Sequence, residues 1–310
     1  MAPRRRLRAW KVLLALLLTL GVAGFVAYYF ATEKLAGDLV KPRNAGRDFD
    51  TSVPDDVSRH LRVERGDVVL DTWVIEPRKE RPPESVDWVL VLHGVSDQKR
   101  TMVGLGRRFA NHGVGAILVD LRGHGLSSEV PITYGAEEVP DLSAVLDAVT
   151  AEGYSLGEVG VYGPSYGGAV GIQLGATDPR VTRAVSVASF ASFRRNVRPH
   201  LEAHTKDWSW IIPGFFVDSM IRIASMRAGF DPDDASPEAD IAHTNGRHLL
   251  VHSRDDEIVP YQQAVDMKDA CGERCELLTL EGMDHLGSLS NQPLRERLHT
   301  FLTGEPLSSL

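Results

Sequence analysis

Six short apolar runs constrain the fold of this chain more than any other feature of its sequence. They lie at 88–92, 115–120, 159–162, 184–187, 248–252 and 277–280. Segments with a helical spacing of apolar positions follow most of them, at 102–111, 139–149, 166–174, 261–271 and 294–301. This alternation is typical of βαβ units with buried parallel strands. With a β-hairpin expected at 61–63 and 68–75, the sequence predicts an α/β fold: a mostly parallel central sheet flanked by helices.

The alternation is interrupted once, between Phe190 and about His243. This stretch is too long for a plain loop and contains several apolar patterns of helical spacing, so we predict a helical cap inserted at about 190–243. Its most apolar residues surround Pro213: Trp208, Trp210, Ile211, Ile212, Phe215 and Phe216. Three roles are open for these residues. They could line an acyl pocket, dip toward a lipid surface, or only pack the cap onto the sheet.

An uncharged apolar run at 12–30 follows a basic N-terminal segment, 1–11. Such a run is long enough to cross the roughly 30 Å hydrocarbon layer as a helix, so we expect one transmembrane helix at 12–30. The alternative is a cleaved signal peptide and a secreted protein, for which Gly21-Val22-Ala23 is a weak cleavage site.

Charge asymmetry predicts the orientation of this helix. Five basic residues precede the run: Arg4, Arg5, Arg6, Arg8 and Lys11. The segment after the run mixes acidic and basic residues. The N-terminus is therefore expected in the cytoplasm and the rest of the chain outside it, as in a signal-anchor protein. The polar segment 31–56 is predicted to be a stalk, which leaves 57–310 as one folded domain.

Composition limits the partners and cofactors of the chain. A formal net charge of −8 gives no general attraction for nucleic acid. Cys271 and Cys275 could form a local disulfide in an oxidising compartment, and two cysteines alone make a poor metal site. There is no His-Glu-x-x-His motif, and Gly104-Leu105-Gly106 lacks the third glycine of a dinucleotide fingerprint. We expect neither a metal nor an organic cofactor.

Ser165 is the candidate nucleophile. It stands in Gly163-Pro164-Ser165-Tyr166-Gly167-Gly168, a G-x-S-x-G pattern between a predicted strand and a predicted helix. A sharp strand-to-helix turn needs small flanking residues, because the serine backbone is strained and its neighbours pack closely. The pattern alone is weak evidence, but its position between strand and helix favours a nucleophilic serine.

Two backbone amides are candidates for holding a negatively charged oxygen near Ser165. One is the amide of Tyr166, directly after the serine, and the other is that of Val95, in the His93-Gly94-Val95 turn after an earlier strand. Acyl transfer needs two such donors aimed at the developing oxyanion. The alternative is a plain turn glycine beside a structural histidine. The segment 120–127 is expected to have a structural role at the same rim.

A serine hydroxyl needs a base to take its proton, and the base needs an acid residue to fix its tautomer. These partners are expected later in the chain, acid first and then histidine. Asp255 and Asp256 follow the predicted strand 248–252, and Asp256 is favoured as the acid. His285 follows the last predicted strand and is the expected base.

With these residues in this order, the chain from about residue 57 resembles the α/β-hydrolase superfamily, especially its esterase, lipase and serine-peptidase-like branches. Related sequences often read His-Gly-x-x-Asp-x-x-Val-Pro after this strand, which implies Asp256 as the acid; Ser253 stands where glycine is usual. The resemblance implies attack by Ser165 on a carbonyl and an acyl-enzyme opened by water. Serine at this turn separates the chain from the dehalogenase and epoxide-hydrolase branches, which use aspartate.

Three functions remain open at this point. The first is a carboxylesterase or lipase-like enzyme acting on a small-molecule or lipid-like acyl ester. The second is a serine peptidase or acyltransferase with the same three residues. The third is a membrane-tethered binding protein without turnover. The fold cannot decide between ester and amide substrates.

Overall fold

The computed structural model describes residues 3–205, 212–285, 287 and 292–304. Within them lies one eight-stranded sheet in the order β1-β2-β4-β3-β5-β6-β7-β8. The strands are β1 (Arg59–Arg65), β2 (Val68–Ile75), β3 (Trp88–Val91), β4 (Gly115–Val119), β5 (Val159–Pro164), β6 (Val181–Val187), β7 (Arg247–Ser253) and β8 (Cys275–Leu280). The hairpin β1–β2 and the pair β2–β4 are antiparallel, and the other pairs are parallel. The predicted mostly parallel sheet is confirmed.

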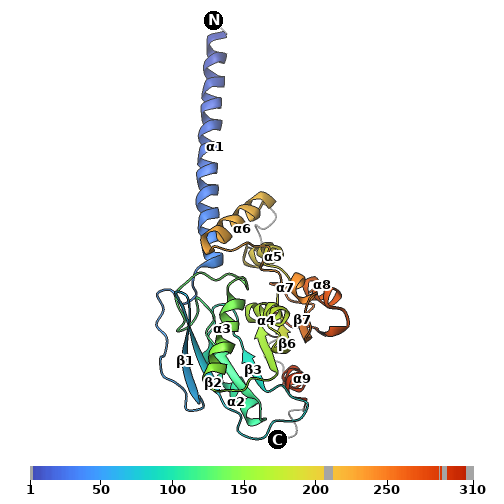
Figure 1. Cartoon of the computed structure of the whole chain (residues 1–310). Coiled ribbons are helices and arrows are strands. Elements are labelled where there is room, and N and C mark those ends of the chain that lie inside the picture. Colours follow the sequence, from blue (N-terminus) through green and yellow to red (C-terminus); the bar gives the residue numbers. More distant parts are fainter. Residues whose placement is uncertain (1–2, 206–211, 286, 288–291, 305–310) are drawn as a thin grey trace.

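Helices cover both faces of the sheet (Figure 1). They are α2 (Val103–Asn111), α3 (Glu138–Ala151), α4 (Ser165–Thr177), α8 (Gln262–Cys271) and α9 (Gln292–Thr303). Leu90 on β3 packs in one cluster with residues of α3 and α4, while its neighbours Val89 and Val91 pack in another with residues of α2 and α9. Successive strand residues point to opposite faces, so burial of both faces explains the uninterrupted apolar runs.

The cap lies between β6 and β7. It contains α5 (Phe193–Thr205), α6 (Gly214–Ala228) and α7 (Pro237–Ile241), where the sequence predicted an insertion. Of its apolar cluster, Trp208, Trp210 and Ile211 lie outside the described residues. Phe216 and Ile212 pack within the cap, whereas Phe215 is 62% exposed.

The first helix is longer than predicted. Helix α1 runs from Pro3 to Val40, and its segment Trp10–Val40 is apolar and long enough to cross a membrane. The side chains of residues 1–9, which include most of the basic cluster, lie outside the described part. Figure 1 shows α1 as one continuous helix projecting from the domain.

The first part of segment 31–56, predicted to be a stalk, is packed on the domain. Thr32, Ala36 and Val40 are buried, and they form a stripe spaced by four residues that packs against the cap. After the helix, the buried Asn44 side chain donates hydrogen bonds to the carbonyls of Gly125 and Ser127. The polar composition of the segment concealed this stripe.

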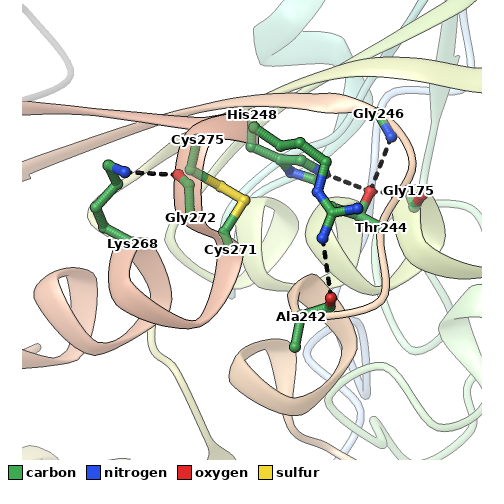
Figure 2. Close-up of a disulfide and its surroundings, with 10 residues drawn as sticks. Gly175, Ala242, Thr244, Gly246, His248, Lys268, Cys271, Gly272 and Cys275 are labelled. Carbon is green, nitrogen blue, oxygen red and sulfur yellow. Dashed lines mark hydrogen bonds between the residues drawn. A yellow bond between two sulfur atoms is a disulfide. The ribbon is translucent and has the colours of Figure 1, made fainter.

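Cys271 and Cys275 form a disulfide (Figure 2). It joins the end of α8 to the beginning of β8, and both sulfur-bearing residues are buried. Nearby, Lys268 Nζ donates to the Gly272 carbonyl, and Arg274 donates to the Ala242 carbonyl. The disulfide lies at the amino end of β8, away from the carboxyl edge of the sheet.

Candidate active site

Ser165 lies at the sharp turn between β5 and α4. Its φ of 47° is in the left-handed region, which non-glycine residues rarely adopt. The turn is tight enough that a Cβ on Gly163 would lie 2.3 Å from the Gly167 carbonyl carbon. The glycines of the motif are therefore required by contact, and the strain at Ser165 is of the kind that proteins keep at functional sites.

The structure brings the three predicted side chains together. His285 Nε2 lies 3.0 Å from Ser165 Oγ, and His285 Nδ1 lies 2.7 Å from Asp256 Oδ2. The residues follow the carboxyl ends of β5, β7 and β8, which meet at one edge of the parallel part of the sheet. Because the Asp256 carboxylate accepts from Nδ1, Nε2 is left to accept the serine proton.

Hydrogen bonds keep Asp256 ionised. Burial by itself would raise its pKa, but hydrogen bonds from His252, His285 and the Val259 amide outweigh burial and hold the pKa of Asp256 well below its usual range. Its other oxygen, Oδ1, accepts from the amides of Ile258 and Val259, each at 2.9 Å. The carboxylate is thus fixed in place and charged.

The neighbouring residues distinguish Asp256 from Asp255. Asp255 is exposed, and its carboxylate accepts from the Gly282 amide at 2.7 Å. Ser253, where related sequences often have glycine, is buried, and its hydroxyl accepts from the Asp255 amide. Asp255 therefore shapes the loop, while Asp256 contacts the histidine.

The His93-Gly94-Val95 turn packs directly against the serine turn. A Cβ on Gly167 would lie 2.5 Å from the His93 carbonyl oxygen, so the two turns touch through their backbones. The turn that carries Val95 thereby lies beside the start of α4. There the Tyr166 amide, one of the first of the helix, has no acceptor within the helix. This arrangement fits a pair of oxyanion donors.

His93 holds that turn. It is fully buried; its Nε2 accepts from the Leu121 amide at 3.1 Å, and its Nδ1 donates to the Gly94 carbonyl at 2.8 Å. Burial lowers the pKa of His93, which keeps the ring neutral. His93 thus has a structural role in holding the turn that contains Val95.

Two residues near the site were missed by sequence reasoning. His252 lies on β7 and contacts Asp256. Glu138 is fully buried and accepts from the Thr133 amide, the Thr133 hydroxyl, the Gly135 amide and the Tyr166 hydroxyl. A signal existed for Glu138, because it falls on the buried stripe of α3 with Leu142, an unusual place for a carboxylate.

Tyr134 connects the serine turn to α1. Its hydroxyl donates to the Leu39 carbonyl of α1 at 2.7 Å, and its ring packs edge-on against Tyr166 at 5.7 Å between centroids. Its φ of 58° is another left-handed value at a non-glycine residue. The end of α1 is therefore in contact with the residue next to the nucleophile candidate through one side chain.

The fold and this arrangement define an α/β-hydrolase, and the chain belongs to the α/β-hydrolase superfamily. Two family models match it in succession: serine aminopeptidase, S33, at residues 83–236, and TAP-like protein at 227–306.

Solved structures share the fold. An esterase of Pyrococcus furiosus has a TM-score of 0.63 at 17% identity, over 85% of this chain and 96% of the esterase. An acylaminoacyl peptidase of Pyrococcus horikoshii has a TM-score of 0.59 at 18% identity, over 79% of this chain and 41% of the peptidase. A curated relative, the uncharacterized protein YqkD of Bacillus subtilis, is 24% identical over 182 residues; the match spans 58% of each protein. The solved structures show the shared fold, and the two family models support a hydrolase.

Proposed function

We propose that the protein is a serine hydrolase that cleaves a carboxylic ester, with Ser165 as nucleophile, His285 as base and Asp256 as the acid that orients the base. The observation that carries this proposal is the continuous pair of hydrogen bonds from Ser165 Oγ through His285 to Asp256. A hydrolase with a serine nucleophile needs these three groups in contact, because the serine hydroxyl is a weak nucleophile until its proton has an acceptor.

In the proposed mechanism His285 Nε2 takes the Ser165 proton as Oγ bonds to the substrate carbonyl carbon. The carbonyl oxygen becomes an oxyanion, held by the Val95 and Tyr166 amides. His285⁺, paired with the ionised Asp256, then gives its proton to the leaving alkoxide, which departs as an alcohol. Water, deprotonated by His285, attacks the acyl-enzyme, and collapse releases the acid and restores the serine.

Ester cleavage is proposed ahead of peptide cleavage because α1 and the apolar cap favour an apolar acyl substrate, small or lipid-like. Peptide cleavage by the same three residues is the second candidate, supported by the match to the serine aminopeptidase model. Acyl transfer and ligand binding without turnover are further alternatives.

We further propose that α1 spans a membrane, with residues 1–11 in the cytoplasm and the hydrolase domain on the other side. The buried disulfide supports this orientation, because disulfides persist in oxidising compartments. Cleavage of the apolar segment as a signal sequence is the alternative.

The proposal is tested by treating the full chain in detergent with a fluorescent fluorophosphonate, which reacts with activated serines. We expect labelling of the parent and of Ser155→Ala, a matched control at an exposed serine, and none of Ser165→Ala. Absence of label on the folded parent would overturn the serine mechanism. Rates on matched p-nitrophenyl esters and p-nitroanilides would then decide between ester and amide.

A further inference from the structure

The contact between α1 and the cap begins inside the apolar part of α1. The Tyr28 ring lies 5.7 Å from the Phe215 ring and 5.5 Å from the Phe216 ring, between centroids, and the Tyr28 hydroxyl lies 2.9 Å from Ser219 Oγ. Further along, Arg227 of α6 pairs with Glu33. The N-terminal end of α6 therefore lies at the level of Tyr28, and its C-terminal end lies near Glu33. In Figure 1, α6 lies at the domain end of α1 and is inclined to it.

The level of Tyr28 follows from the spacing of charges in α1. The stretch from Val12 to Thr32 is uncharged, between Lys11 and Glu33. At 1.5 Å per residue it is about 30 Å long, which matches the hydrocarbon layer. Tyr28 precedes the end of this stretch by about one helical turn, or roughly 5 Å. A bilayer that covers the stretch would reach past Tyr28.

Phe215 is an exposed aromatic ring at this same level. It is 62% exposed, while the adjacent Phe216 is 9% exposed and packs in the cap. On α1, Tyr29 and Phe30 are exposed at that level too. Burying such a ring in an apolar medium is favourable by about 1.5–3 kcal/mol. Aromatic rings collect at membrane boundaries. We therefore expect lipid to cover Phe215 together with the adjoining surface of α1.

We propose that the N-terminal tip of α6, Gly214 to Phe216, enters the boundary of the bilayer that α1 spans. The proposal rests on the proposed membrane span of α1. The cap would then be held at the lipid surface at two points, the transmembrane helix and this tip. Met226 on the same helix is 76% exposed but lies about three turns further on, near the level of Glu33, and is expected in water.

Depth-dependent quenching tests the proposal in the full chain. Single variants Leu17→Cys, Phe215→Cys and Met226→Cys would be labelled with an environment-sensitive fluorophore, because the native cysteines are held in a disulfide. The proteins would be placed in phosphatidylcholine vesicles that carry a nitroxide lipid. Leu17, exposed in the middle of the apolar run, is the positive control, and Met226 is the matched control on α6.

We expect quenching at Leu17 and Phe215 but not at Met226, with the Phe215 label about 5–10 Å below the headgroup boundary. Quenching of Leu17 alone would overturn the contact of the tip and leave the span standing. Absence of quenching at both Leu17 and Phe215 would overturn the contact of the tip and the membrane span of α1. None of these readouts depends on hydrolysis, so failure of the serine mechanism would be seen separately by fluorophosphonate labelling.

Discussion

His252 Nε2 lies 3.4 Å from Asp256 Oδ2, the same oxygen that accepts from His285 Nδ1 at 2.7 Å. The same His252 nitrogen donates to the Val259 carbonyl at 2.8 Å, so its N–H faces both this carbonyl and the Asp256 carboxylate. We therefore expect His252 to act as a positioning residue through Asp256.

Replacement of His252 should reduce turnover without changing substrate binding. We expect His252→Leu to lower kcat about tenfold, or 1.4 kcal/mol, with KM unchanged, because Asp256 loses one of its donors. His252→Gln, whose amide can still donate, should recover most of that loss. For comparison, Asp256→Asn should lower kcat about 10⁴-fold. Equal kcat values for His252→Leu and the parent, from ester hydrolysis kinetics, would contradict the assigned role.

Glu138 should be needed as a carboxylate. Its four described partners all donate to it, from Thr133, Gly135 and Tyr166. In Glu138→Gln an amide NH₂ must face at least one of these donors, which leaves buried groups unsatisfied at a cost of about 1–3 kcal/mol. Urea unfolding would measure this loss of free energy of unfolding. The control is Glu152→Gln at a surface ion pair, whose free energy of unfolding should change by under about 1 kcal/mol. Equal effects of the two variants would show that the buried contacts contribute little.

The disulfide should contribute to stability and not to turnover. It closes a short loop, for which the chain-entropy relation gives about 2 kcal/mol. The double variant Cys271→Ala, Cys275→Ala should lose about this much free energy of unfolding. Its kcat should stay that of the parent, since the disulfide lies at the start of β8 and His285 follows the end of that strand. A large fall in kcat at full folding would mean that the disulfide positions His285.

Asp240 on α7 should make the protein less stable as pH rises. Burial raises the pKa of Asp240 to about 6 from its ordinary value of 3.8, and the charge of His243 opposes this rise only in part. Between these two pH values the folded state binds more protons than the unfolded state, so stability falls as pH rises through the window and stays lower above it. Because Asp240 is only partly buried, we expect a loss of about 1–2 kcal/mol. Asp240→Asn should therefore be more stable than the parent at pH 8 and no more stable at pH 4. Urea unfolding of the two proteins at each pH would measure this. The same difference in stability at pH 4 and pH 8 would contradict the prediction.

Most of the sheet and the order of the site residues could be predicted from the sequence because both depend on local patterns. The apolar runs correspond to β3–β8, and the segments around Ser165, Asp256 and His285 each carry a recognisable turn. The contacts of Glu138 and His252 could not be predicted, because they depend on which distant groups surround a buried polar side chain. The structure gives the geometry of the three side chains, and their chemical roles remain our proposal.

The docking of α1 was missed for a related reason. A stripe of Thr32, Ala36 and Val40 is weakly apolar and does not stand out among charged neighbours. The stripe can be recognised as a packing interface only in the structure, where α6 lies against it and Met220 and Ile221 are buried in the same cluster. The first part of the polar segment after the apolar run is thus packed on the domain.

This docking predicts where the chain can be shortened. A fragment of residues 28–310 keeps the buried stripe and the Leu39 carbonyl that accepts from Tyr134, so it should fold and label with fluorophosphonate like the full chain. A fragment of residues 41–310 exposes the apolar face of α6 and frees Tyr134, which packs on Tyr166. Loss of Val40 and the partly buried Leu35 and Leu39 should cost at least about 3 kcal/mol. Equal urea midpoints and equal labelling of the two fragments would show that the end of α1 is dispensable; a lower midpoint and weaker labelling of the shorter one would show that the helix forms part of the hydrolase domain.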